Sequence, residues 1–186
     1  MKKQKRQFFI IVCILVFCVG GYLIAKNIPK EEETTVGTES RTVTSITQSE
    51  VSGLSYLYEG NIIELIKEDE VWKSSEDKSL SLDQTVISNM LSYVCSITTD
   101  TVIDNPENLA EYGLTNPENT ISLTLADGSN VQLLIGDYLD INGEYYALLA
   151  GDTNVYTISS YIPSTFNKSL DMLIVTEEET TQETEE

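Results

Sequence analysis

The chain has 186 residues and a net charge of −19, from 11 Lys and Arg residues against 30 Asp and Glu residues. All the acids follow Lys30, and such a surface repels phosphate backbones, which argues against a nucleic-acid partner. The absence of His excludes Ser-His and Cys-His nucleophiles and the commonest ligand of transition metals. We therefore expect no catalytic residues, no cofactor and no metal site.

The first predicted element is a membrane anchor from Phe8 to Ala25. This uncharged stretch would span about 27 Å as a helix, close to the thickness of a hydrocarbon core. Basic residues crowd segment 1–7 and acids begin at Glu31, so the positive-inside rule predicts a single-pass cell-membrane protein with a cytoplasmic N-terminus. A cleaved secretory signal is the alternative, although Leu23 and Ala25 fit a cleavage site poorly.

Two polar segments flank the predicted domain. Residues 26–41 and 176–186 are rich in Glu and Thr without apolar periodicity, and we expect both to be disordered. The linker's reach of about 20 Å would keep the domain near the bilayer. Residues 42–175 are predicted to form one extracytoplasmic domain of ordinary size.

Short apolar runs predict the first strands. A strand is expected at 42–47, and Leu54–Tyr58 and Ile62–Lys67 flank Glu59-Gly60-Asn61 as a hairpin. Val71-Trp72 begins a third strand.

Two helices are predicted next, and the first runs from Asp83 to Ile97 with its apolar residues on one face. Its start is open between Asp83 as N-cap and a capping box formed by Ser81 and Gln84.

The second predicted helix is short. Asn105 is expected as its N-cap, with Pro106 in the first position and Gly113 as the left-handed residue after the end. Leu109 and Leu114 would then make the contact of a Schellman motif.

The C-terminal half again predicts hairpins. Residues 121–125 and 131–135 alternate apolar and polar side chains around the Asp127-Gly128 turn, and 145–149 pairs with 155–158. A last short helix within 160–173 would be broken or started by Pro163. This pattern predicts an α+β fold, a mainly antiparallel sheet of hairpins with two or three inserted helices, preceded by one transmembrane helix.

Few residues are candidates for chemistry. Cys95 lies within the first helix and is predicted to be a buried apolar residue instead of a nucleophile. A weak calcium site at Asp137, Asp140, Asn142 and Glu144 is one alternative, but Asn142-Gly143 fits a hairpin turn better. A carboxylate dyad is the other catalytic alternative, and most acids fall in predicted turns.

Aromatic side chains on the strands could line a binding groove, with a core position expected for Trp72 and Tyr146. The set comprises Tyr56, Tyr58, Trp72, Tyr145, Tyr146, Tyr156 and Tyr161.

Several pieces, in order, resemble the domain-of-unknown-function family numbered 4340. They are IIELIKEDEVW (62–72), LDQTVISNMLSYVCSI (82–97), EYGLTNPENTISLTLADG (111–128), IGD (135–137), EYYALL (144–149) and NVYTIS (154–159). The most specific is Tyr112-Gly113-Leu114, followed by Ile135-Gly136-Asp137 and the Tyr145-Tyr146 pair. The resemblance implies a membrane-anchored bacterial protein with no assigned reaction, whose relatives are often encoded beside ABC-type exporters.

We therefore expect a non-enzymatic binding module that holds a membrane or envelope protein partner through a face or edge of its sheet. The alternative is a carboxylate-based envelope enzyme, such as a glycan-directed hydrolase. This chain departs from relatives with tandem copies of the domain, since it carries one.

Overall fold

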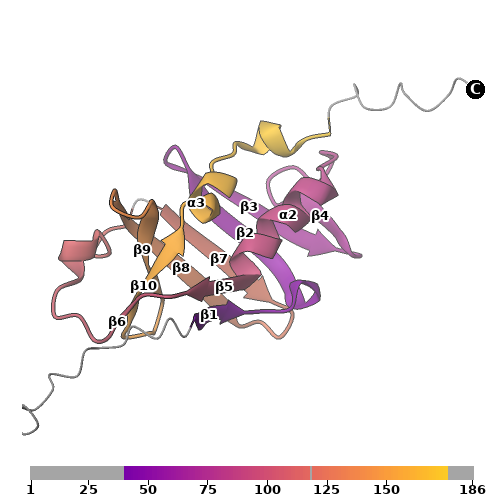
Figure 1. The fold of residues 1–186 in the computed structure, drawn as a ribbon. Coiled ribbons are helices and arrows are strands. Elements are labelled where there is room, and N and C mark those ends of the chain that lie inside the picture. Colours follow the sequence, from indigo (N-terminus) through magenta and orange to yellow (C-terminus); the bar gives the residue numbers. More distant parts are fainter. Residues whose placement is uncertain (1–39, 118, 176–186) are drawn as a thin grey trace, which may run out of the picture. The chain divides into compact units, whose positions relative to one another are not determined.

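The computed structural model describes residues 40–117 and 119–175. An eight-stranded antiparallel sheet has the order β4-β3-β2-β7-β8-β9-β10-β6, and β1 pairs with β5 in a separate two-stranded ribbon (Figure 1). The strands are β1 (Arg41–Ser45), β2 (Val51–Tyr58), β3 (Asn61–Glu68), β4 (Val71–Ser74), β5 (Ser96–Thr99), β6 (Val102–Ile103), β7 (Asn119–Leu125), β8 (Asn130–Leu139), β9 (Glu144–Leu149) and β10 (Val155–Ser159). The helices are α2 (Gln84–Cys95) and α3 (Tyr161–Thr165), with short 3₁₀ turns η1 (Gln48–Glu50), η2 (Leu109–Tyr112) and η3 (Leu170–Leu173).

The predicted α+β class is therefore confirmed for the described residues. The expected anchor at 8–25, most of the linker and the tail at 176–186 lie outside them. Among the described helices, none combines the length and the apolar character needed to cross a membrane. Strand β1 begins at Arg41, a residue that the sequence assigned to the linker.

The predicted hairpins are confirmed, and their turns follow from local chemistry. Tyr58 pairs with Asn61, which leaves a two-residue turn whose members, Glu59 and Gly60, have φ of 48° and 80°. Two successive positive φ values define the type I′ turn that matches strand twist. Strands β7–β8, β8–β9 and β9–β10 are also antiparallel neighbours.

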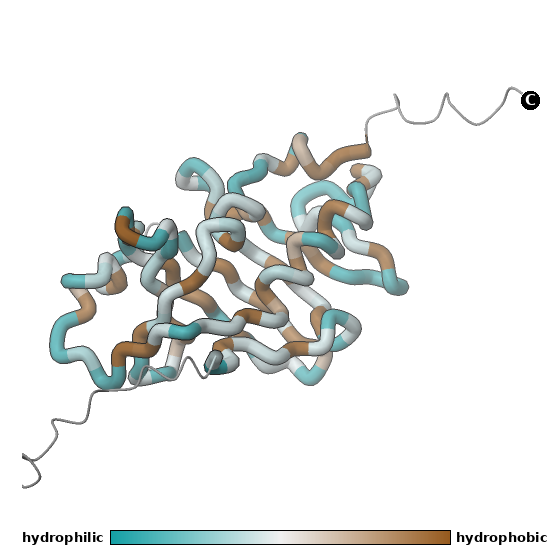
Figure 2. The backbone as a smooth tube through the Cα atoms, viewed as in Figure 1, coloured by the Kyte–Doolittle hydropathy of each residue, from teal (hydrophilic) through white to brown (hydrophobic). Residues whose placement is uncertain are grey.

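One face of the sheet carries the main core. In Figure 1 the two helices and the β1–β5 ribbon cross in front of the sheet, and Figure 2 shows apolar residues recurring along the strands while many of the turns are hydrophilic. Helix α2 turns its apolar side chains inward because they recur at helical spacing. Its buried residues are Ile87, Met90, Leu91, Val94 and Cys95.

The opposite face is covered at one end only. Leu114, Leu148 and Val155 form a second buried cluster there, packed against Leu109 of η2 and partly buried neighbours. Among the described residues, this face is more open over β2 and β7, where Ser52, Ser55 and Ser122 are half-buried and Thr124 is exposed.

Helix α2 confirms one predicted boundary and corrects the other. The Asp83 carboxylate accepts hydrogen bonds from the backbone N–H groups of Thr85 (2.8 Å) and Val86 (3.1 Å), so Asp83 is the N-cap. The helix ends at Cys95, not at Ile97, because the chain turns into strand β5.

A side chain from far upstream causes that early end. The Thr44 hydroxyl donates to the carbonyl of Val94 (2.8 Å) and accepts from the N–H of Ile97 (2.9 Å). The N–H of Ile46 donates to the carbonyl of Cys95 (2.8 Å). Strand β1 and the residue after it thus pair the backbone C=O and N–H groups that a longer helix would have paired internally.

The second predicted helix is shorter than expected at its start. Asn108, not Asn105, is the N-cap, since its side chain accepts from the N–H of Ala110 (3.1 Å) and donates to Glu111 (3.2 Å). Asn105 instead adopts a left-handed backbone with φ of 45°. The Asn108 amide thus caps the first turn through its oxygen and is held by Glu111 through its nitrogen, and this outweighs the Asn-Pro signal at Asn105.

The predicted end of that helix is confirmed. Gly113 is left-handed with φ of 68°, and the N–H of Leu114 donates to the carbonyl of Leu109 at 3.0 Å. Both leucines belong to the second cluster, as the Schellman motif requires.

Candidate functional site

A groove of about 660 Å³ opens at one end of the sheet, where β2, β8 and β10 end and β3, β7 and β9 begin. It lies between the β2–β3 turn, the start of β9 and helix α3, and its size is in the range of ligand sites. It is lined by Leu57, Tyr58, Glu59, Gly60, Asn119, Tyr145, Pro163, Ser164, Phe166 and Asn167.

Aromatic packing builds the walls. Tyr58 and Tyr145 are both half-buried, and the Tyr145 ring lies 4.9 Å from the ring of Tyr138. Phe166 meets Tyr56 edge to face at 5.4 Å, and the Tyr56 hydroxyl donates to the carbonyl of Lys168 (3.0 Å). These contacts fix the segment after α3 against β2, so the groove has a rigid base.

Among the described residues that line the groove, Glu59 is the charged one. It is exposed on the turn, and the remaining polar lining consists of neutral amide, hydroxyl and phenol groups. The lining within 40–117 and 119–175 therefore offers no pair of carboxylates for acid-base work.

The same end of the sheet exposes large apolar side chains. Ile62 is 67% exposed, Ile141 94% and Tyr161 71%. None of the three lines the groove, but each belongs to a segment next to it: β3, the β8–β9 turn and α3.

Away from the groove, the two segments that carry the family resemblance most specifically, 112–114 and 135–137, pack directly on each other. A Cβ on Gly136 would overlap the carbonyl oxygen of Tyr112 and lie 3.0 Å from Leu114, and one on Gly113 would lie 2.8 Å from the backbone nitrogen of Asp137. The β8–β9 register shifts between Ile135 and Tyr138, which makes room for the approach. These glycines serve close backbone packing and carry no chemistry of their own.

Residues 72–184 match the family described as a domain of unknown function (DUF4340), more than half of the chain. The chain belongs to this family. No curated protein and no solved structure matches it. The match begins within β4, so Glu59 and the β2–β3 turn are contributed by a part of the chain that precedes it.

The side chains weighed for calcium are not gathered in the DUF4340 domain. The Asn142 amide donates to Glu144 (2.6 Å) across the β8–β9 turn, while Asp137 lies beside Gly113. Within 40–117 and 119–175, no three His, Cys, Asp or Glu side chains are placed to hold a metal ion.

Cys95 is a buried free thiol. Burial raises its pKa to about 11, so the thiol is protonated at neutral pH and poorly suited to nucleophilic attack.

Six of the seven candidate aromatic residues separate into three groups, and the seventh, Tyr161, is exposed on α3. Trp72 (6% exposed) is in the core as predicted, together with Tyr56 and Tyr156. Tyr146 packs in the second cluster, its ring 4.9 Å from that of Tyr112. Only Tyr58 and Tyr145 line the groove.

Sequence reasoning missed the polar members of the groove. Glu59, Asn119, Ser164 and Asn167 come from three separate stretches of the chain. The order of the hairpins was the available signal for these residues. Consecutive hairpins bring every second turn to the same end of the sheet, so residues from separate turns can meet there.

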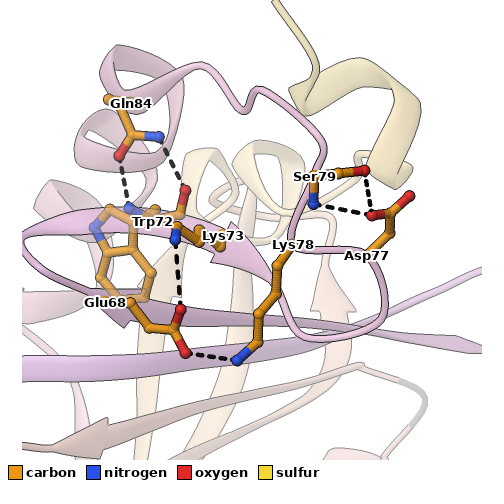
Figure 3. Close-up of polar contacts among 7 residues, drawn as sticks. All are labelled: Glu68, Trp72, Lys73, Asp77, Lys78, Ser79 and Gln84. Carbon is orange, nitrogen blue, oxygen red and sulfur yellow. Dashed lines mark hydrogen bonds and ion pairs between the residues drawn. The ribbon is translucent and has the colours of Figure 1, made fainter.

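The sheet edge at β4 is blocked by a side chain (Figure 3). The Gln84 amide accepts from the N–H of Trp72 (2.8 Å) and donates to its carbonyl (3.0 Å), and it also donates to the carbonyl of Leu82 (2.9 Å). Gln84 therefore occupies the groups that an added strand would use.

Ion pairs hold the loop beyond that edge. Lys78 (2.6 Å) and Lys73 (3.5 Å) both contact the Glu68 carboxylate, and the Lys78 hydrogen bond is the largest cause of the lowered pKa of Glu68 (Figure 3). The opposite edge strand, β6, has only two residues. Neither edge is a favourable template for a partner strand.

Proposed function

We propose that this DUF4340 protein is a non-enzymatic binding module that holds a protein partner at a membrane, with the groove as its contact surface. The observation that carries the proposal is the groove itself, which combines an aromatic wall, a base fixed by the Tyr56–Phe166 contact and, among the described lining residues, one exposed carboxylate, Glu59. A hydrolase of the carboxylate type would need two acids facing one substrate bond.

The proposal differs in one respect from the sequence expectation of docking through a sheet face or edge. The edges are blocked or short, which disfavours β-strand addition. Thr124 and Gln132 are exposed on the open sheet face, and Ser122 is half-buried between them. These three side chains on that face are polar, whereas the groove is concave and combines polar groups with the apolar side chains of Leu57, Pro163 and Phe166.

The membrane location is part of the proposal. A helix at 8–25 would tether the domain outside the cell, where a short linker keeps it close to other membrane proteins. Such tethering raises the effective concentration of both partners, so a weak interface is sufficient. The family resemblance makes an ABC-type exporter complex the first partner to test.

In-cell photo-crosslinking of the full-length chain tests the proposal. A photoreactive residue at Ser164 in the groove should trap a membrane protein in the native host, while one at Ser88 on α2 should not. Equal trapping from both positions would argue against the groove as the contact. If the purified full-length protein hydrolyses a cell-wall glycan and Glu59→Gln abolishes that hydrolysis while the fold persists, the carboxylate-enzyme alternative replaces the binding module.

The side of the membrane on which the domain lies is tested by cysteine labelling. With the three native cysteines replaced, a single cysteine at Ser40 should react with a membrane-impermeant maleimide on intact cells. Labelling only after lysis would place the domain in the cytoplasm and reverse the proposed orientation.

A further inference from the structure

We infer that the groove binds a Lys or Arg side chain presented by an extended segment of the partner protein. This inference rests on the proposed function and adds the chemistry of the contact. Three features of the described residues carry it: the charge balance around the groove, the aromatic wall and the neutral polar lining.

The charge balance favours a cation. Five basic residues are described, and four of them contact carboxylates: Arg41 with Asp104, Lys67 with Glu70, and Lys73 and Lys78 with Glu68. The described lining contains no basic residue and one acid, Glu59, although the fifth basic residue, Lys168, directly follows the lining residue Asn167. A cationic group entering the groove therefore meets Glu59 and the negative potential of a strongly acidic domain, with one basic residue beside the lining.

The aromatic wall supplies a specific contact. Tyr58 and Tyr145 lie in the lining, and Tyr138 packs against Tyr145 at the rim. A guanidinium or ammonium group over a tyrosine face is attracted by the negative potential of the ring, and this attraction is stronger when water is excluded. Combined with the nearby Glu59 carboxylate, these rings distinguish a cationic side chain from a neutral one.

The neutral lining suits the rest of a peptide. Asn119, Ser164 and Asn167 offer amide and hydroxyl groups that can pair with a main chain. The volume of about 660 Å³ exceeds what one side chain fills, so neighbouring residues of the segment would also enter.

Peptide binding to the full-length protein in zwitterionic nanodiscs tests the inference. The probes are Gly-Gly-Arg-Gly-Gly and the same peptide with citrulline, which has the shape of Arg without its charge. We expect the Arg peptide to shift the NMR signals of ¹³C-labelled Tyr58 and Tyr145 and to bind about fivefold or more tightly than the citrulline peptide. Equal binding of the two peptides, or no shift with either, would overturn the inference.

A matched pair of variants separates the groove from the general acidity of the surface. Glu59→Gln and Glu107→Gln each remove one exposed negative charge, but Glu107 lies outside the groove. Glu59→Gln should weaken Arg-peptide binding about fivefold, whereas Glu107→Gln should change it less than twofold. Equal losses would mean non-specific attraction and would overturn the site.

The crosslink and the peptide titrations together distinguish a wrong ligand from a wrong function. If the Ser164 crosslink forms in cells but the Arg and citrulline peptides bind alike, the binding module stands and the cationic ligand is wrong. If a neutral chitin oligosaccharide shifts the same tyrosine signals more strongly than the Arg peptide, the groove is a glycan site and the inference is overturned.

Discussion

Gly136 shows how a single missing side chain lets two segments meet. Its backbone lies against the carbonyl of Tyr112, and any Cβ would overlap that oxygen. Gly128 offers a comparison, because its φ is +85° but nothing lies within 4 Å of a Cβ added there. The first glycine is required by space and the second by backbone conformation alone.

We therefore expect Gly136→Ala to destabilise the domain by at least about 3 kcal/mol, since backbone atoms must move. Gly128→Ala should cost about 1–2 kcal/mol from left-handed strain. Thermal unfolding followed by the fluorescence of Trp72, the single tryptophan, would measure both. Similar losses in the two variants would contradict the packing of Tyr112 on β8.

Two buried tyrosines differ in what their hydroxyl groups bind. Tyr156 donates to the Asp152 carboxylate, and this hydrogen bond, with backbone N–H groups of Asn154 and Thr153, lowers the pKa of Asp152. Burial, followed by the contact with Asp152, raises the pKa of Tyr156. Tyr56 donates instead to a neutral carbonyl.

These partners predict different pH dependence. A carboxyl with a lowered folded pKa contributes stability above its unfolded pKa of about 3.9 and loses it as pH falls through the folded value. Tyr156→Phe should thus destabilise by about 1–2 kcal/mol at pH 6, and the difference from wild type should shrink below pH 4. Tyr56→Phe should cost a similar amount that stays constant from pH 6 to pH 3. Urea unfolding across this range provides the measurement, and a constant deficit for Tyr156→Phe would contradict the assigned pairing.

Among the elements, β4 depends on helix α2 for its protected edge. Gln84 begins α2, and its amide pairs with both backbone groups of Trp72. Gln84→Ala keeps a good helix former at the start of α2 but exposes the strand.

We expect Gln84→Ala to self-associate through β4, seen as a concentration-dependent rise in mass by analytical ultracentrifugation. Gln132→Ala, an exposed position on a central strand, is the control and should remain unchanged. If Gln84→Ala stays at the wild-type mass at every concentration, the side chain does not protect the edge.

Sequence patterns were sufficient to predict those elements whose structure depends on nearby residues. Hairpins and the Gly113 helix end depend on neighbours within a few residues, so local signals predicted them. The end of α2 depends on Thr44, some 50 residues upstream, and no local pattern could reveal that hydroxyl. Asn108 is the N-cap in place of Asn105, because its side chain accepts from the N–H of Ala110 and is held by Glu111.

For the whole molecule, the groove was less predictable than the fold. Tyr58 and Tyr145 were among the aromatic candidates, but periodicity did not separate them from Tyr56, which is buried in the same strand as Tyr58. The polar lining required the sheet order, which places β2 beside β7 and leaves α3 over the strand ends. Sheet order is a tertiary property that sequence patterns alone leave open.

The charge balance of the whole domain predicts its response to salt. Within 40–117 and 119–175, five basic residues face nineteen acids, and compaction brings unpaired carboxylates together. Added salt shortens the Debye length from about 10 Å at 0.1 M to about 3 Å at 1 M, which weakens this repulsion. The ion pairs of Lys73 and Lys78 also weaken, but exposed pairs contribute only about 0–1 kcal/mol each.

Repulsion therefore dominates the response to salt. The melting temperature of the full-length chain in non-ionic detergent should rise by several degrees between 20 mM and 0.5 M NaCl, and by the same amount with KCl. Millimolar CaCl₂ added at 0.5 M NaCl should have no further effect. A fall in melting temperature with NaCl would mean that attractive pairs dominate, and a rise specific to calcium would reveal a site that the described carboxylates do not form at rest.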